Sequence, residues 1–433
     1  MPLIVLALAS AAQGEARPVF SVTDYGAIGD NQTDDTRAFE EAIAQARASG
    51  RASQVLVPRG GVYLIRPINL TSNLDFYIEA GATITGVADH SAWPVIAAAP
   101  SYGQGRDHPG PRYTSLLHGE HLHDVAIRGE GESSVIDGQG WYWWARHLAR
   151  PSPEIYTRGH LIELMYSRNV SVLDLSMRDS PFWNNHFFGC DGVHVRGVHI
   201  SAPYDSPNTD GWDPDSSRNV LVEESTYRGG DDCVAIKSGW DCFGVAYGRA
   251  CANITIRNLT CDGRYAGVAI GSEVSGGVDG VTVEGVHFLS ANGAAHIKTG
   301  LSRGGYVTNV VFRDLTFADG AALQDGILVD AFYHATNPSC PSSWRPAAPT
   351  RMANFSFLRI EGSRTTCMNS PFHFKGVKDA PITGVRVDGV HLPTSSRGLQ
   401  SQWLCQNVSG SVVDGSVTPW PPCKELSVVA AWP

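Results

Sequence analysis

The chain has 433 residues, of which 18% are charged and 46 are glycine, and its net charge is -10. The low charge content and the many glycines exclude a coiled coil or a disordered chain and favour a β-rich protein. The excess of acidic residues argues against a nucleic-acid partner, although a locally basic surface would still bind an acidic polysaccharide.

Residues 1–18 are predicted to be a secretory signal peptide or its remnant. Met1–Gly14 is apolar and then small in composition, but it lacks a basic start. A disordered or buried N-terminal strand is the alternative. No other stretch approaches the roughly 20 apolar residues that a membrane span requires. Secretion to the extracellular space or cell wall is further indicated by seven glycosylation triplets, at Asn31, Asn69, Asn169, Asn253, Asn258, Asn354 and Asn407.

The nine cysteines are typical of a secreted chain with disulfides. None forms a close C-x-x-C metal pattern, and no cofactor is expected. The odd count leaves one thiol free, and the apolar surroundings of Cys190 make it the candidate. Three pairs are predicted from position alone: Cys242 with Cys251, Cys340 with Cys367, and Cys405 with Cys423.

The N-terminal region predicts one helix. Arg37–Ala48 has apolar residues at helical spacing, and Thr33–Thr36 has the composition of an N-cap. Capping accounts for Asp34 and Asp35, so we assign them no catalytic role. This helix is predicted to be the only substantial one in the chain.

From Gln54 onward the pattern changes to short β segments that recur. Each repeat unit begins with Asn or Gly followed by alternating Val, Ile or Leu, and the first spacings are 23, 27, 34, 27 and 29 residues. Repeats of this length indicate a solenoid or a propeller, and because a propeller blade needs four strands and roughly 40 residues, a parallel β-helix fits better. The helix would then cap its open end. The units begin at Asn169, Gly192, Asn219, Asn253, Gly280, Asn309 and Gly384.

Other segments are predicted to be loops or surface. Ser91–Pro111 and Pro338–Thr350 are rich in Pro and polar residues and are expected to be inserted loops. Trp141–Trp144 fits packing under a long loop at least as well as a sugar-binding cleft, so it is left out of the site. Three histidines are expected at polar surface positions: His160, His194 and His199.

Three carboxylates stand about one repeat apart beside glycines. Asp210 lies 22 residues before Asp232, which follows Asp231 directly. A lone Asp near Gly most often makes a turn, but one coil of separation places these residues on one face. Adjacent side chains in a strand point to opposite sides, so Gly229 and Gly230 are expected to permit a bend or bulge.

Such a cluster is suited to acid/base hydrolysis. Three close carboxylates cannot all be ionised cheaply, so the pKa of at least one should rise. That combination provides a proton donor beside ionised acceptors, which is the division of labour needed to cleave a glycosidic bond.

The sequence resembles glycoside hydrolase family 28, the polygalacturonases and their relatives. The resemblance rests on motifs in the same order across most of the chain: Asp24–Ala27, Ile136–Gly140, Asn208–Gly211, Gly230–Gly239, Ile270–Glu273, Ser275–Gly277, Ile297–Thr299 and Arg303–Tyr306. It implies one all-β domain over residues 19–433, a right-handed parallel β-helix. It also implies inverting hydrolysis of the α-1,4-galacturonosidic bonds of pectin without a metal.

The resemblance also implies residue roles. Asp231 matches the general acid, whereas Asp210 and Asp232 match the pair that activates water; inversion requires about 6.5–9.5 Å between acid and base. Lys298 matches a residue that binds the substrate carboxylate. The resemblance further implies a disulfide between Cys233 and Cys261.

Further residues are expected to bind substrate. Asn208 and His296 flank Asp210 and Lys298 in the matched motifs. Asn185 and His186 fall about one coil before Asp210, at the predicted edge of the cleft. The alternation of the strand leaves the facing of Lys237 open.

Two positions depart from the family pattern. Ala266 stands where the family has His, and His296 stands where it has Arg. Arginine binds a carboxylate with two hydrogen bonds, and a neutral histidine cannot form such a pair. The alternatives are therefore a hydrolase of rhamnogalacturonan or substituted galacturonan, and a weakly active or inactive wall-binding β-helix; a pectate lyase fits the motifs poorly. A monomer that binds pectic polysaccharide and no membrane is expected.

Overall fold

The structure is a computed structural model that describes residues 17–333, 336–398 and 402–431. The predicted signal peptide lies outside the described residues, except for Arg17 and Pro18. Among the described residues, no helix is both long and apolar enough to cross a membrane.

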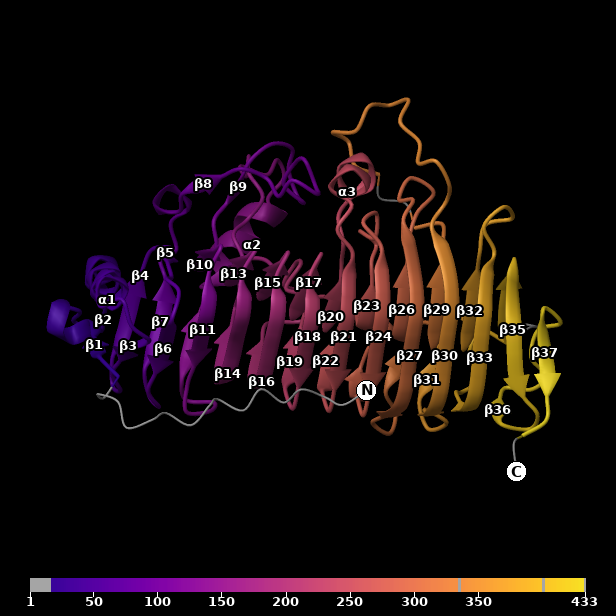
Figure 1. Ribbon diagram of the computed structural model, residues 1–433. Helices are drawn as coiled ribbons and strands as arrows, with labels where there is room; N and C mark the ends of the chain where they lie inside the picture. The colour runs from indigo at the N-terminus through magenta and orange to yellow at the C-terminus, as the bar shows by residue number, and fades with distance from the viewer. Residues whose placement is uncertain (1–16, 334–335, 399–401, 432–433) are drawn as a thin grey trace.

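Strands dominate the described part of the chain, and Figure 1 shows them side by side in chain order along an elongated stack. Most belong to two parallel sheets. The 11-stranded sheet contains β5 Ile68–Asn69, β10 Leu117–Glu120, β13 Ile162–Met165, β15 Asn185–Phe188, β17 Trp212–Asp215, β20 Val234–Ile236, β23 Ala266–Ile270, β26 Gly293–Lys298, β29 Ile327–Asp330, β32 Phe372–Lys375 and β34 Trp403–Gln406.

The second sheet has 22 strands. They are β1 Val19–Ser21, β2 Asp30–Asp34, β3 Ser53–Val57, β4 Val62–Ile65, β6 Leu74–Ile78, β7 Thr83–Gly86, β11 His123–Arg128, β12 Val135–Asp137, β14 Arg168–Arg178, β16 Asp191–Ser201, β18 Arg218–Glu223, β19 Thr226–Gly229, β21 Cys251–Arg257, β22 Thr260–Gly263, β24 Val278–Glu284, β25 His287–Ser290, β27 Tyr306–Phe317, β30 Arg351–Glu361, β33 Ile382–His391, β35 Val408–Val413, β36 Val417–Thr418 and β37 Leu426–Val429. Two small pairs remain: β8 Val95–Ile96 with β9 Arg112–Tyr113, and β28 Ala322–Leu323 with β31 Thr366–Cys367.

The sequence repeat matches the stacking of the strands. The apolar residue that follows each repeat start pairs with its equivalent in the next coil, in the buried ladder Val170, Val193, Val220, Ile254, Val281 and Val310. The residue before each of them has a left-handed backbone, with φ between 51° and 76°, a conformation that Gly and Asn adopt most readily. The repeat and the all-β class are thus confirmed; the hand of the coil stays a prediction.

The N-terminal helix α1 spans Thr36–Ala48 and buries its predicted apolar face. Asp35 does not cap it through its side chain. That carboxylate instead accepts hydrogen bonds from the backbone N–H groups of Ile28 and Gly29, at 2.7 and 3.0 Å, which ties the preceding turn to the helix start.

The prediction of a single substantial helix is wrong. Helix α2 spans Gly140–Leu148 and contains the tryptophan cluster, in which Trp143 and Trp144 are buried and Trp141 is exposed. Helix α3, Asp241–Tyr247, lies between β20 and β21. The four consecutive aromatic residues Trp141–Trp144 of α2 show no alternation of apolar and polar positions, so the helical spacing was not recognised in the sequence.

Three disulfides are present among the described residues. Cys405–Cys423 is confirmed, whereas the predicted pairs Cys242–Cys251 and Cys340–Cys367 are wrong, because Cys242 is joined to Cys340. Cys190 is free as predicted, and so are Cys251 and Cys367, each of them buried. The error follows from inferring pairs from position along the chain, which does not fix connectivity.

The predicted loops lie above the sheets. Residues 338–350 contain no strand or helix, and 91–111 contain only β8 and the end of a short 3-10 helix, His90–Ala92. Figure 1 shows both loops and α3 rising from the same edge of the stack. The Asn337 amide donates to the Tyr102 carbonyl at 2.7 Å, so segments more than 200 residues apart in the chain are in contact.

Candidate active site

The three predicted acids come together at the start of two neighbouring strands. Asp210 lies just before β17, and Asp231 and Asp232 lie between β19 and β20. Their nearest carboxylate oxygens are within 4.8 Å of one another. Asp210 and Asp232 are buried, whereas Asp231 is partly exposed.

Close backbone packing explains the glycines. A Cβ at Gly230 would lie 2.0 Å from the carbonyl oxygen of Ser206, so only glycine lets the two coils approach here. The Gly230 N–H donates to the Thr209 hydroxyl at 3.1 Å, and the Asp232 N–H donates to Asp231 Oδ1 at 2.9 Å. The first bond joins the two coils, and the second fixes the turn that carries Asp231 and Asp232.

The surroundings give the three acids different pKa values. Burial and the charge of Asp232 raise the pKa of Asp231 to about 6. Burial, followed by the charges of Asp231 and Asp213, raises the pKa of Asp210 well above its usual range. Burial alone would also raise the pKa of Asp232, but Lys298, whose Nζ lies 2.7 Å from Oδ2, keeps it below its usual value. An ionised carboxylate therefore adjoins two that hold protons more tightly, as expected.

The nearest oxygens of the three acids lie within 4.8 Å of one another. This limit joins single oxygens, whereas the about 6.5–9.5 Å of inverting enzymes is measured between whole carboxyl groups. Inversion therefore stays a prediction. The disulfide Cys233–Cys261, implied by the resemblance, is present and joins the start of β20 to β22 with a Cα–Cα distance of 6.0 Å.

The two departures from the family pattern lie beside Asp232. The Ala266 N–H donates to Asp232 Oδ1 at 2.8 Å, so this position contributes a backbone donor and no side-chain polar group. Burial, together with nearby Lys298, lowers the pKa of His296 to about 4. His296 is accordingly neutral at neutral pH and does not replace an arginine charge.

Asn208 contacts the acids directly. Its amide nitrogen lies 3.5 Å from Asp231 Oδ2, and its amide oxygen accepts from Arg158 Nη2 at 2.8 Å. The buried Arg158 guanidinium also donates to the Pro181 and Pro207 carbonyls. It therefore fixes the orientation in which Asn208 presents its N–H groups to the acid.

The predicted placement of Asn185 and His186 at an exposed cleft edge is wrong. Asn185 is fully buried, and its amide donates to the Gly211 carbonyl at 3.1 Å. His186 is 3% exposed and lies between Glu163 and Asp215, at 2.7 and 3.5 Å. Burial alone would lower the pKa of His186, but these two carboxylates raise it to about 9.

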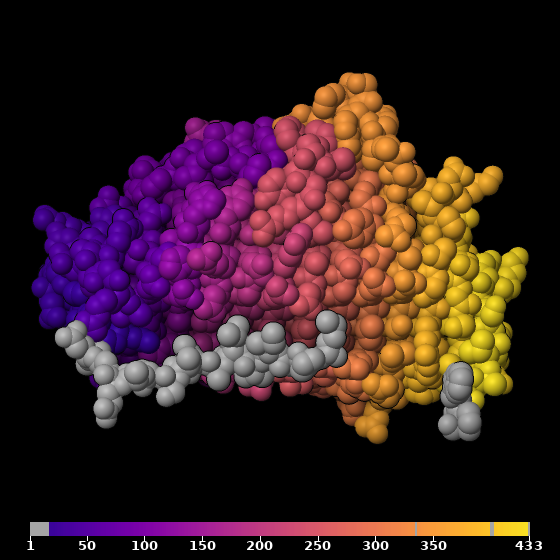
Figure 2. All heavy atoms as spheres, viewed as in Figure 1, coloured from indigo at the N-terminus to yellow at the C-terminus, as the bar shows by residue number. Residues whose placement is uncertain are grey.

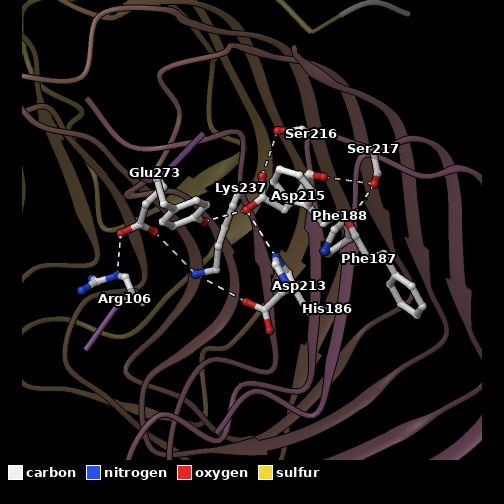
Figure 3. Close-up of polar contacts among 12 residues, drawn as sticks. Arg106, His186, Phe187, Phe188, Asp213, Asp215, Ser216, Ser217, Lys237 and Glu273 are labelled. Atoms are coloured by element: carbon white, nitrogen blue, oxygen red, sulfur yellow. Dashed lines mark hydrogen bonds and ion pairs between the residues drawn. The ribbon is translucent and has the colours of Figure 1, made fainter. Parts of the chain in front are cut away.

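A buried charge network, missed by the sequence analysis, lies next to the acids (Figure 3). Lys237 Nζ is 3.4 Å from Asp213, 3.6 Å from Glu273 and 3.8 Å from Asp210. Burial raises the pKa of Asp213 to about 7 even though Lys237 opposes the effect. The signal was present in the polar residues at alternate positions of the strand Trp212–Asp215.

The histidine predictions are partly wrong. His160 is buried and stacks on Trp183 with ring centroids 5.1 Å apart. Burial lowers the pKa of His160 well below its usual value. His194 and His199 are partly exposed on β16, as expected.

Two clusters have the composition of a metal site but carry competing cations. His160, Glu163 and His186 offer ligand atoms within 4.8 Å of one another, yet Arg112 Nη1 lies 2.8 Å from Glu163. The three aspartates are likewise flanked by Lys237 and Lys298. Fixed positive charges at these positions oppose the binding of a divalent cation.

Clustered acids with different pKa values, set on stacked parallel strands, are an arrangement that a glycoside hydrolase uses. The chain belongs to glycosyl hydrolases family 28, whose family model matches residues 48–417. It is 36% identical over 411 residues to a probable polygalacturonase of Vitis vinifera, covering 94% of this chain and 80% of that one. A polygalacturonase of Juniperus ashei is 28% identical over 416 residues, covering 94% and 74%.

Solved structures share the fold. An exopolygalacturonase from Thermotoga maritima matches with a TM-score of 0.67 at 22% identity, over 93% of this chain and 91% of that one. A family 28 exopolygalacturonase from Yersinia enterocolitica matches with a TM-score of 0.71 at 18% identity, over 95% and 78%.

Proposed function

We propose that this protein is a secreted polygalacturonase that hydrolyses α-1,4-galacturonosidic bonds in pectin with inversion. The observation that carries the proposal is the pairing of a partly exposed Asp231, whose pKa is raised to about 6, with the ionised Asp232. The polygalacturonases of Vitis vinifera and Juniperus ashei named above support the choice of substrate. We further propose one domain over residues 19–433, wound as a right-handed parallel β-helix, acting as an extracellular or wall-bound monomer.

In the proposed mechanism each of the three acids has a different role. Asp231 is protonated below about pH 6 and donates its proton to the glycosidic oxygen as the bond breaks. Asp232 stays ionised beside Lys298 and accepts the proton of the attacking water, while Asp210 orients that water. Lys298 and Asn208 direct N–H groups toward the position of the sugar.

Pectic polysaccharides of different backbones test the proposal. The protein should release reducing ends from polygalacturonate without the ultraviolet absorbance of unsaturated products, and proton NMR of the first product should show inverted anomeric configuration. Release of unsaturated products would instead identify a lyase. The absence of reducing ends from every backbone would reject the enzyme and leave a wall-binding protein.

One observation favours a second substrate class. The position expected to hold an arginine is His296, which is neutral at neutral pH, so the site lacks one cation for a galacturonate carboxylate. The alternative is hydrolysis of rhamnogalacturonan or substituted galacturonan. Faster release of reducing ends from either of these than from polygalacturonate would establish it.

A further inference from the structure

The outer face of the 11-stranded sheet is divided at the acids into a covered half and an open half. Next to the acids on the N-terminal side, three residues in register from successive strands are at most 3% exposed: Glu163, His186 and Asp213. On the C-terminal side, the corresponding polar residues are all partly exposed: His296, Lys298, Asp330, His373 and Lys375. Polar side chains of this face are thus covered immediately N-terminal to the acids and partly exposed on the C-terminal side.

Three loop segments form the cover, which we call the roof: residues 99–106, 240–242 and 337–340. The Trp240 N–H donates to the Ser101 carbonyl at 2.8 Å, and Asn337 donates to the Tyr102 carbonyl at 2.7 Å. The disulfide Cys242–Cys340 links the second and third segments. Each segment is therefore bonded to another, and the roof is one connected structure.

The roof is also bonded to the residues beneath it. The Tyr102 hydroxyl donates to Asp215 at 2.6 Å, and Arg106 Nε donates to Glu273 at 3.0 Å. The Arg106 guanidinium lies 4.7 Å from the ring centroid of Trp240. Charge-assisted hydrogen bonds to buried carboxylates such as Asp215 and Glu273 are costly to break, so the roof is a fixed part of the fold.

Little space remains under the roof. The cavity lined by Tyr102, Arg106, Trp183 and His186 has a volume of about 20 Å³, which is room for about one water molecule. A sugar ring does not fit, so a polysaccharide that reaches the acids cannot continue toward the N-terminal coils along this face.

We propose that the protein cleaves pectic chains from an end, with the polymer lying over the C-terminal coils and its terminal unit stopped at the roof. This inference rests on the proposed hydrolase function. Lys298 and Lys375, both partly exposed on the open half, provide positive charge along the path of an acidic polymer. An internal bond does not reach the acids, because the chain would have to extend on both sides of them.

Wild-type protein and polygalacturonate provide the first test. Reducing ends should rise while the mean chain length of the remaining polymer, measured by size exclusion, stays nearly constant and only short products appear. One internal cut per chain would halve the mean length, and that result would overturn the proposal. If no pectic backbone is hydrolysed, the proposed function itself fails, which is a different outcome.

Blocked oligomers and roof variants provide the second test. Blocking one end of an oligogalacturonate should abolish its cleavage, and blocking the other end should not; equal cleavage of both blocked substrates would also overturn the proposal.

The double variant Tyr102→Ala/Arg106→Ala, whose folding is checked by its thermal transition, should begin to release longer internal fragments. The matched control is Tyr77→Ala/Arg128→Ala, which removes a stacked Tyr–Arg contact at 4.2 Å on the other sheet and should keep the wild-type products.

A folded roof variant with the unchanged wild-type product pattern would show that the roof does not impose chain-end cleavage. If the roof variant does not fold, the wild-type product pattern and the blocked oligomers decide.

Discussion

Replacing Lys298 by methionine tests the central electrostatic claim, because Lys298 keeps Asp232 ionised. The two side chains are 2.7 Å apart, and their exposures are 13% and 2%. Removing one partner of a buried ion pair costs about 3–5 kcal/mol, and we take about 3 kcal/mol because Lys298 is not fully buried. With about 2.1 cal/mol/K of unfolding entropy per residue, this loss lowers the Tm by about 3 °C.

The pH dependence gives the sharper signature. The pKa of Asp232 is lower in the folded protein than its usual value, so the stabilisation is complete above about pH 4, the unfolded pKa, and disappears as the pH falls through the folded pKa. The variant should therefore be much less stable than wild type at pH 7, and the difference should shrink progressively as the pH falls below about 4. In the variant, burial raises the pKa of Asp232, so the acid limb of kcat/KM on polygalacturonate should move to higher pH.

Lys375→Met is the matched control. Lys375 lies on the same face two strands further on, in register with Lys298 through Asp330, and its ammonium lies 4.7 Å from the ring centroid of Phe332. Its loss should cost less than about 1 kcal/mol and leave the acid limb unchanged. Equal destabilisation of both variants with identical pH profiles would refute the assignment of Lys298 as the group that holds Asp232 ionised.

Three further substitutions test the site. Asp231→Asn should reduce kcat on the best pectic substrate by about 10²–10⁴ without lowering the Tm, and full turnover would show that another residue donates the proton. Burial raises the pKa of Asp213 to about 7, so wild type loses stability as the pH rises from about 4 to 7. In guanidinium unfolding, Asp213→Asn should therefore have a higher free energy of unfolding than wild type at pH 8 but not at pH 4. A difference between the two proteins that does not depend on pH would contradict this. His296→Arg should lower KM for polygalacturonate about tenfold through a charge-assisted hydrogen bond of about 1.5 kcal/mol, and an unchanged KM would place that position away from the substrate.

The repeat was predictable because its cause is local. A left-handed residue is needed at the start of each unit, and the sequence supplies Asn or Gly at the same point of every coil, as at Asn169, Gly192 and Asn219. Inward Val and Ile residues then alternate with outward polar residues over a short distance. One-coil spacing also brought Asp210 beside Asp231 and Asp232, as the 4.8 Å limit between their oxygens shows.

The alternating polar residues of the network were visible in the sequence, but their burial was not predictable, because it depends on what covers the sheet. Alternation places His186 and Asp213 on the outer face, but it does not tell whether that face meets water or a loop. The cover comes from residues far away in the chain, such as Tyr102 over Asp215 across 113 positions and Cys340 bonded to Cys242 across 98. The same reason explains why His160 was expected at the surface and is buried.

Lys298 has enough donors to bind Asp232 and a substrate carboxylate at the same time. An ammonium group has three donors, and the bond to Asp232 uses one of them, so the same cation can keep the base ionised and attract the acidic sugar. The neutral His296 adds no second charge for that sugar. The proposed role of Lys298 in binding the substrate carboxylate therefore predicts that Lys298→Met lowers binding and turnover together.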